Sequence, residues 1–151
     1  MHQFECCLAK DAFSTEKAEI LKGWDERKRR LIKLGAKGGL GYVDPDIVPL
    51  CDALNQLPGV CTLQSCAGHS AEDSDGAIYP GELWLRLGPG IKGRFEAAAR
   101  QLAANTLIDR VGKIYWEDGK ETVTVIFKGN ESGHLAQSSV VLLKFFEKLH
   151  I

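Results

Sequence analysis

Two short stretches on either side of Glu117-Asp118-Gly119-Lys120 constrain the fold of this chain more than any other feature. Arg110–Trp116 and Thr122–Lys128 have the composition of strands. An Asp-Gly step between two such stretches is typical of a tight hairpin turn. We therefore expect an antiparallel hairpin here, within a sheet that is mostly antiparallel.

The rest of the chain adds helices before and between strands. Ser14 is a suitable N-cap, Gly35 is a suitable stop, and Asp44-Pro45 and Pro58-Gly59 bracket a second apolar stripe. We expect helices at about 15–34, 44–57, 95–104 and 137–149, and further strands at 60–65 and 82–87. This order predicts a single α+β domain over residues 1–151, with a strand-strand-helix unit that occurs twice and suggests a structural duplication.

Composition narrows the class of protein. The 151 residues are 44% hydrophobic and 26% charged, which is typical of an ordinary globular domain. The formal net charge of -1 argues against a protein that coats nucleic acid without specificity. Every apolar run is too short to span a membrane, and the five cysteines fit reduced thiols, so we expect a cytoplasmic protein with no membrane partner.

The first candidate site is the turn Ser65-Cys66-Ala67-Gly68-His69, directly after the strand expected at 60–65. Cys66 could be a nucleophile with His69 as its base, or Cys61, Cys66 and His69 could hold zinc. The turn could also be purely structural, with a buried thiol and a hydroxyl that caps local backbone. The remaining interpretation is a ligand pocket, lined by backbone N–H groups and by Ser65 and His69.

A second candidate is the glycine-rich stretch Gly88-Pro89-Gly90-Ile91-Lys92-Gly93, which follows one predicted strand and precedes a predicted helix. It matches the G-x-G-x-x-G pattern of dinucleotide-binding turns. A helix N-terminus with close backbone approach suits an anion or a nucleotide-like cofactor. Glycine and proline are also ordinary turn residues, so a simple turn is the alternative.

A third candidate is the basic stretch Arg27, Lys28, Arg29 and Arg30, next to Trp24. It predicts either a solvated helix surface or a surface that contacts RNA phosphates. Of the other histidines, we expect His134 to be a surface or partly buried residue and His150, near the C-terminus, to be exposed.

These features also carry a family resemblance. An early helix with Lys and Trp, then Val43-Asp44-Pro45-Asp46-Ile47-Val48-Pro49-Leu50, Asn55 and Thr62-Leu63-Gln64-Ser65-Cys66-Ala67-Gly68, resembles the tRNA wybutosine-synthesising methyltransferase family. The resemblance extends over about residues 13–68. Ala67 and His69 stand where the family's Thr-x-x-Ser-Cys-Ser-Gly-Arg turn has Ser and Arg.

The resemblance implies a divergent member of this family, which carries out the N4-methylating step on a modified guanosine of tRNA. It implies S-adenosylmethionine as cofactor, tRNA as partner, and a pocket lined by Ser65, Cys66, Gly68 and His69. Our own inference adds Gly88, Gly90 and Gly93 to the cofactor pocket. The alternatives are a non-catalytic RNA- or ligand-binding relative and a small zinc-containing domain.

Overall fold

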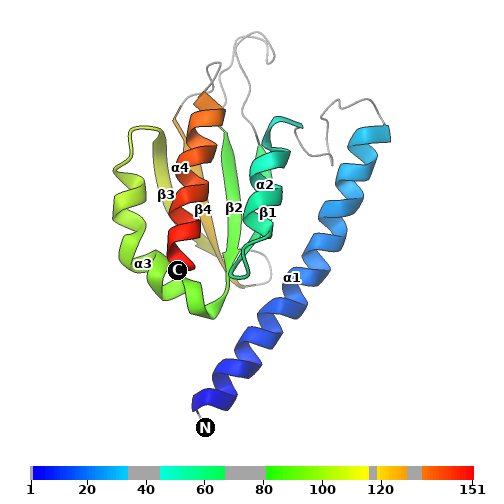
Figure 1. Cartoon of the computed structure of the whole chain (residues 1–151), viewed down its shortest axis with the longest axis vertical. Coiled ribbons are helices and arrows are strands. Elements are labelled where there is room, and N and C mark those ends of the chain that lie inside the picture. The colour runs from blue at the N-terminus through cyan, green and yellow to red at the C-terminus, as the bar shows by residue number, and fades with distance from the viewer. Residues whose placement is uncertain (1, 34–44, 67–80, 116–118, 129–133) are drawn as a thin grey trace.

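The computed structural model describes residues 2–33, 45–66, 81–115, 119–128 and 134–151. The elements follow one another in the predicted order (Figure 1). They are α1 (His2–Lys33), the 3-10 turn η1 (Pro45–Ile47), α2 (Val48–Asn55), β1 (Val60–Cys66), β2 (Glu82–Leu87), α3 (Pro89–Ala103), β3 (Ile108–Tyr115), β4 (Glu121–Phe127) and α4 (His134–Leu149). The α+β class is confirmed.

The strands form one antiparallel sheet in the order β1-β2-β4-β3. The predicted hairpin is β3–β4, in which Tyr115 pairs with Glu121 across the turn. Gly119 has a φ of 75°, a backbone conformation that favours glycine, which accounts for the Asp-Gly signal. The units β1-β2-α3 and β3-β4-α4 repeat the strand-strand-helix order, and their strands β2 and β4 pair at the centre of the sheet.

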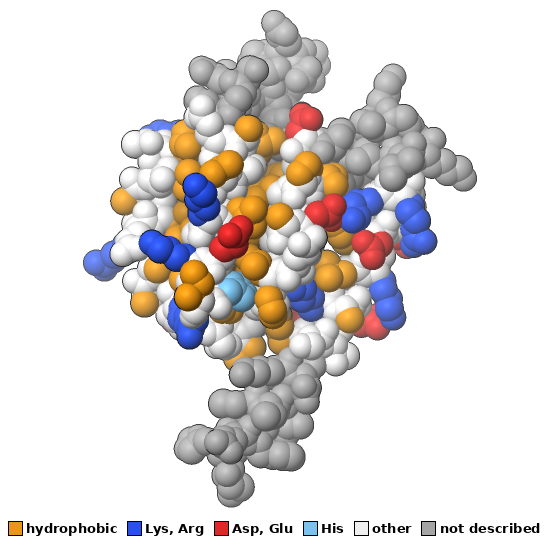
Figure 2. Space-filling model, in the orientation of Figure 1, with side chains coloured by type: hydrophobic (Ala, Val, Ile, Leu, Met, Phe, Trp, Pro, Cys, Tyr) orange, Lys and Arg blue, Asp and Glu red, His pale blue; other side chains and the backbone are white. Residues whose placement is uncertain are grey.

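The core lies between the sheet and α2, α3 and α4, which cover one face of it (Figure 1). Alternation along the strands turns Leu83 and Leu85 of β2 into this layer, where both are fully buried. Phe95 of α3 stacks on Phe146 of α4 with ring centroids 5.8 Å apart. Figure 2 shows apolar side chains gathered mid-face over these helices, with charged ones mostly toward the margins.

α1 lies beside β1 and α2, and its first turns extend past the rest of the chain (Figure 1). The Lys17 ammonium donates to the Leu57 carbonyl at 2.6 Å, and burial lowers the pKa of Lys17. The prediction that this helix starts at about 15 is wrong. It begins at His2 and runs through Ser14, because residues 2–13 contain no glycine or proline and include several good helix formers.

The starts of the three later helices also differ from the predictions. The second helix is split, since η1 precedes α2, and Pro49 lies in the first turn of α2, where its missing N–H costs nothing. α3 starts at Pro89 instead of 95, because proline is well suited to the first helical position. α4 starts at His134 instead of 137.

Candidate functional site

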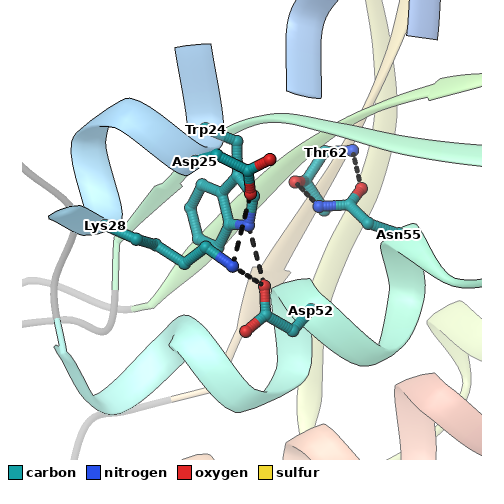
Figure 3. Close-up of polar contacts among 6 residues, drawn as sticks. All are labelled: Trp24, Asp25, Lys28, Asp52, Asn55 and Thr62. Carbon is teal, nitrogen blue, oxygen red and sulfur yellow. Dashed lines mark hydrogen bonds and ion pairs between the residues drawn. The ribbon is translucent and has the colours of Figure 1, made fainter. Parts of the chain in front are cut away.

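The end of β1 carries the first two residues of the predicted Ser65–His69 turn. Ser65 pairs with Leu83 and Cys66 with Glu82, at the start of β2. Gly68, His69 and Ala67 lie outside the described residues. The segment from α2 to β1 that leads to this turn is held by several polar contacts, which are drawn in Figure 3.

One group of contacts joins α1 to α2. The Trp24 indole N–H and the Lys28 ammonium both donate to the same carboxylate oxygen of Asp52, each at 2.8 Å. Lys28 also lies 3.5 Å from Asp25. The hydrogen bond to Asp52 is the main reason that the pKa of Lys28 is raised. Because Trp24 is only 3% exposed, Asp52 supplies the acceptor for a donor on a buried side chain.

A second pair of contacts joins α2 to β1. The Asn55 side-chain amide donates to the Thr62 hydroxyl, and the Thr62 backbone N–H donates to the Asn55 side-chain oxygen, both at 2.9 Å. Thr62 is 2% exposed, so this exchange satisfies buried polar atoms. Asn55 and Thr62 belong to the segment that carries the family resemblance. We call Trp24, Lys28, Asp52, Asn55 and Thr62 together the polar hub (Figure 3).

The basic stretch is not one uniform cationic surface. Lys28 is paired within the polar hub, and the Arg27 guanidinium lies 5.7 Å from the centre of the Trp24 ring. Arg29 is exposed. The side chain of Arg30 lies outside the described residues. Successive residues point around the helix, so among the described side chains of this stretch Arg27 and Arg29 are the ones available to phosphates.

The glycine-rich stretch forms the N-terminus of α3, with Gly88 as its N-cap. The Gly88 N–H donates to the Gly59 carbonyl at 2.9 Å, and a Cβ on Gly88 would lie 3.0 Å from the Phe13 ring. Packing against α1 therefore explains this glycine. A Cβ on Gly90 or Gly93 would meet nothing within 4 Å. Gly88 and Gly90 line a hollow of about 350 Å³ together with Arg94.

The described residues of the predicted pocket lie near opposite ends of β2. Cys66 pairs with Glu82 at one end of β2, whereas Val60 pairs with Leu87 at the other end, next to Gly88. Glu82 and Gly88 are six positions apart along an extended chain, a distance of about 20 Å. Ser65 and Cys66 therefore do not share a wall with Gly88, Gly90 and Gly93, and the single pocket expected from the sequence divides into two regions.

His150 packs near the glycine-rich stretch and bonds to Gly59, so the expectation that this side chain is exposed is wrong. It is half-buried, its Nε2 accepts from the Gly59 N–H at 3.0 Å, and its Nδ1 lies 2.7 Å from the Phe146 carbonyl. These partners fit a neutral ring that carries its proton on Nδ1. The sequence around His150 could not predict these partners, because Gly59 lies 91 positions away.

A pocket that the sequence did not predict lies between α1, the C-terminal end of β2, the start of α3 and the start of β4. This α1 pocket has a volume of about 420 Å³. Its apolar lining includes Phe13, Leu87, Phe95 and Val123. Its charged lining is Glu16, Arg86, Lys92, Lys120 and Glu121. The ion pairs cross long stretches of sequence, since Glu16 lies 70 positions from Arg86 and 104 from Lys120.

The two carboxylates of the α1 pocket each contact two cations. Glu16 lies 2.5 Å from Arg86 and 3.0 Å from Lys120. Burial alone would raise the pKa of Glu16, but hydrogen bonds from these two cations and their charges together lower it. Glu121 lies 3.0 Å from Lys92 and 3.3 Å from Lys113. The hydrogen bond from Lys92 is the main cause of the lowered pKa of Glu121.

The zinc interpretation concerns Cys61, at the start of β1, and Cys66, at its end, whereas the nucleophile interpretation concerns Cys66 alone. Burial raises the pKa of the Cys61 thiol to about 11, so it is protonated at neutral pH. Within the described ranges, no group of three or more His, Cys, Asp or Glu side chains is arranged to hold a metal. None of the described helices is both long and apolar enough to cross a membrane.

Comparison with known proteins supports the fold alone. No family model matches the sequence, and no curated protein matches it. Among solved structures, the PH1069 protein from Pyrococcus horikoshii is similar over 93% of this chain and 92% of its own, with a TM-score of 0.51 and 14% identity. At this identity, the likeness shows a shared arrangement of helices and strands and says nothing about activity.

Proposed function

We propose that this protein is a cytoplasmic, S-adenosylmethionine-dependent tRNA methyltransferase that acts on a modified guanosine. The observation that supports the proposal best is the polar hub. Asn55 and Thr62, which carry the resemblance to the wybutosine-synthesising family, bond to each other, and the early-helix Trp24 and Lys28 meet at Asp52. These contacts join α1 to α2, and α2 to the strand that ends at Ser65 and Cys66.

The end of β1 fits the proposed donor better than the glycine-rich stretch does. Gly88 is explained by its contact with Phe13, and a Cβ on Gly90 or Gly93 would meet nothing within 4 Å, so no contact of the described residues singles out this stretch as a binding wall. Ser65 and Cys66 end a strand that the polar hub fixes in place. We therefore propose Ser65 and Cys66, together with Gly68 and His69 beyond the described residues, as the pocket wall.

When bound, S-adenosylmethionine supplies an electrophilic methyl group. Methyl transfer requires a nucleophilic nitrogen to be held in line with that carbon, and positioning of this kind lowers the barrier without a metal or a covalent intermediate. In the proposal, Ser65 and Cys66 orient the reacting groups, and Arg27 and Arg29 contact tRNA phosphates. Arg30 remains part of the proposed RNA surface, whereas Lys28 positions α1 through Asp52.

Isothermal titration of the full chain with S-adenosylmethionine tests the proposal. We expect saturable heat that the Ser65→Ala and Cys66→Ala variants weaken and the Gly93→Ala variant leaves unchanged. Transfer of labelled methyl groups to tRNA that carries the tricyclic guanosine precursor is the second readout. Absence of both binding and transfer would refute the methyltransferase proposal, and tRNA binding without either would favour the non-catalytic relative.

A further inference from the structure

The α1 pocket has the size and the lining of a small-ligand site. Its volume of about 420 Å³ lies within the range of about 300–1,000 Å³ that such pockets usually have. Phe95 and Val123, which are 1% and 3% exposed, form part of an apolar floor. The floor continues through Phe13, whose ring is half-buried, so a planar apolar group has an aromatic surface to contact.

The charges around this floor favour an anion. Among the described residues that line the pocket, the cations Arg86, Lys92 and Lys120 outnumber the carboxylates Glu16 and Glu121 by one. The N-terminus of α3 lies at the same pocket through Pro89, and its first turn contains no acidic residue. The partial positive charge of a helix N-terminus adds to the excess of cations.

The cations differ in how firmly they are held. The Arg86 side chain is 9% exposed and pairs with Glu16, which is 25% exposed, so this pair is a fixed part of the wall. The Lys92 and Lys120 side chains are 46% and 54% exposed. An ammonium has three N–H donors, so each of these exposed lysines can bond an incoming anion while it keeps its carboxylate partner.

We propose that the α1 pocket binds a nucleotide, with its base against the apolar floor beside Phe13 and its phosphate between Lys92 and Lys120. A nucleotide combines a planar ring with a strongly charged acceptor, which is the combination that this lining offers. The nucleotide is either free or part of an RNA strand. This site is independent of the proposed methyl-donor pocket, because Ser65 and Cys66 lie at the opposite end of β2.

Isothermal titration of the full chain with guanosine 5′-monophosphate, guanosine and a short single-stranded RNA tests the site. We expect the monophosphate or the RNA to bind, and guanosine to bind at least about tenfold more weakly, which corresponds to one lost charge-assisted hydrogen bond. Binding of the monophosphate identifies a free nucleotide as the ligand. Binding of the RNA alone, with the same dependence on lysine, identifies an RNA nucleotide.

Two lysine variants separate a nucleotide site from a purely structural ion-pair network. Lys92→Gln combined with Lys120→Gln removes both exposed cations of the pocket and should weaken binding at least about tenfold. Lys113→Gln is the matched control, because Lys113 pairs with Glu121 and Glu96 but does not line the pocket, and we expect the affinity to change little.

The proposal is overturned if neither the monophosphate nor the RNA binds, or if the double variant binds as tightly as the native chain. It is also overturned if guanosine binds as tightly as the monophosphate or the RNA, whichever of the two binds. Thermal unfolding of each variant confirms that the chain remains folded, which the exposure of both lysines leads us to expect. These outcomes do not depend on whether S-adenosylmethionine binds at the end of β1.

Discussion

Asp52 is the residue at which the structure makes its most quantitative prediction. Asp52→Ala removes the acceptor of the buried Trp24 N–H, which costs about 1–3 kcal/mol when a buried donor is left unsatisfied. The ion pair with Lys28 adds less than about 1 kcal/mol, because the Asp52 side chain is 39% exposed. The higher helix propensity of alanine offsets up to about 0.7 kcal/mol. We therefore expect a net loss of about 1–3 kcal/mol.

Asp52→Asn is the control for this loss, because it keeps an oxygen acceptor for Trp24 and removes only the charge. It should cost no more than about 1 kcal/mol. For a chain of this length, the alanine variant should lower the midpoint of thermal unfolding by about 2–12 °C and the asparagine variant by at most about 4 °C. Circular dichroism measures both midpoints, and urea unfolding gives the free energies.

A double-mutant cycle isolates the hydrogen bond from the other effects. Trp24→Phe removes the indole N–H, so Asp52→Ala should cost less in that background than in the native chain. The expected coupling is about 1 kcal/mol or more. A coupling near zero, or equal losses for the alanine and asparagine variants, would refute the reasoning that Asp52 stabilises the chain by satisfying Trp24.

The structure makes two further predictions about stability. Gly59→Ala should destabilise the chain by about 1–3 kcal/mol, because the new Cβ would overlap Ile91. Gly93→Ala should stabilise it by about 0.5–1 kcal/mol, because the new Cβ meets nothing and alanine favours the helix. Urea unfolding measures both changes, and the same sign for both would contradict this reasoning. Because the folded-state pKa of Glu16 is lowered, its stabilising effect is present above the unfolded pKa of about 4.5 and is lost as pH falls through the lower folded value. Glu16→Gln should therefore flatten the loss of stability between about pH 5 and pH 3, and an unchanged acid slope would contradict the assignment.

Local sequence chemistry accounts for the elements that were predicted correctly. Asp118-Gly119 marked the hairpin because its turn requires a positive φ, which glycine adopts readily. Pro58-Gly59 indicated the end of the second helix, which stops at Asn55, because proline and glycine do not continue a helix. The boundary errors at Ser14 and at residue 95 arose because capping residues and glycines also occur inside helices when neighbouring residues favour the helix.

The candidate sites depended on contacts that no local pattern reveals. Gly88-Pro89-Gly90-Ile91-Lys92-Gly93 matched a nucleotide-binding pattern, but its first glycine is explained by the approach of Phe13, which lies on another helix. The partners of His150 were likewise invisible, since its bond to Gly59 spans 91 positions. A motif records residue spacing along one segment, whereas such packing depends on which segments meet.

The sequence by itself determined the order of helices and strands, the antiparallel hairpin and the segment that resembles an RNA-modifying family. These properties arise from turn residues, periodicity and short motifs, all of which act over a few positions. Only the tertiary structure decided that Cys66 pairs with the first residue of β2, whereas Gly88 follows its last residue. It also decided that Glu16, Arg86 and Lys120 line one pocket. Strand register and helix docking bring together residues that are 70 and 104 positions apart, and they are set by the packing of the whole core.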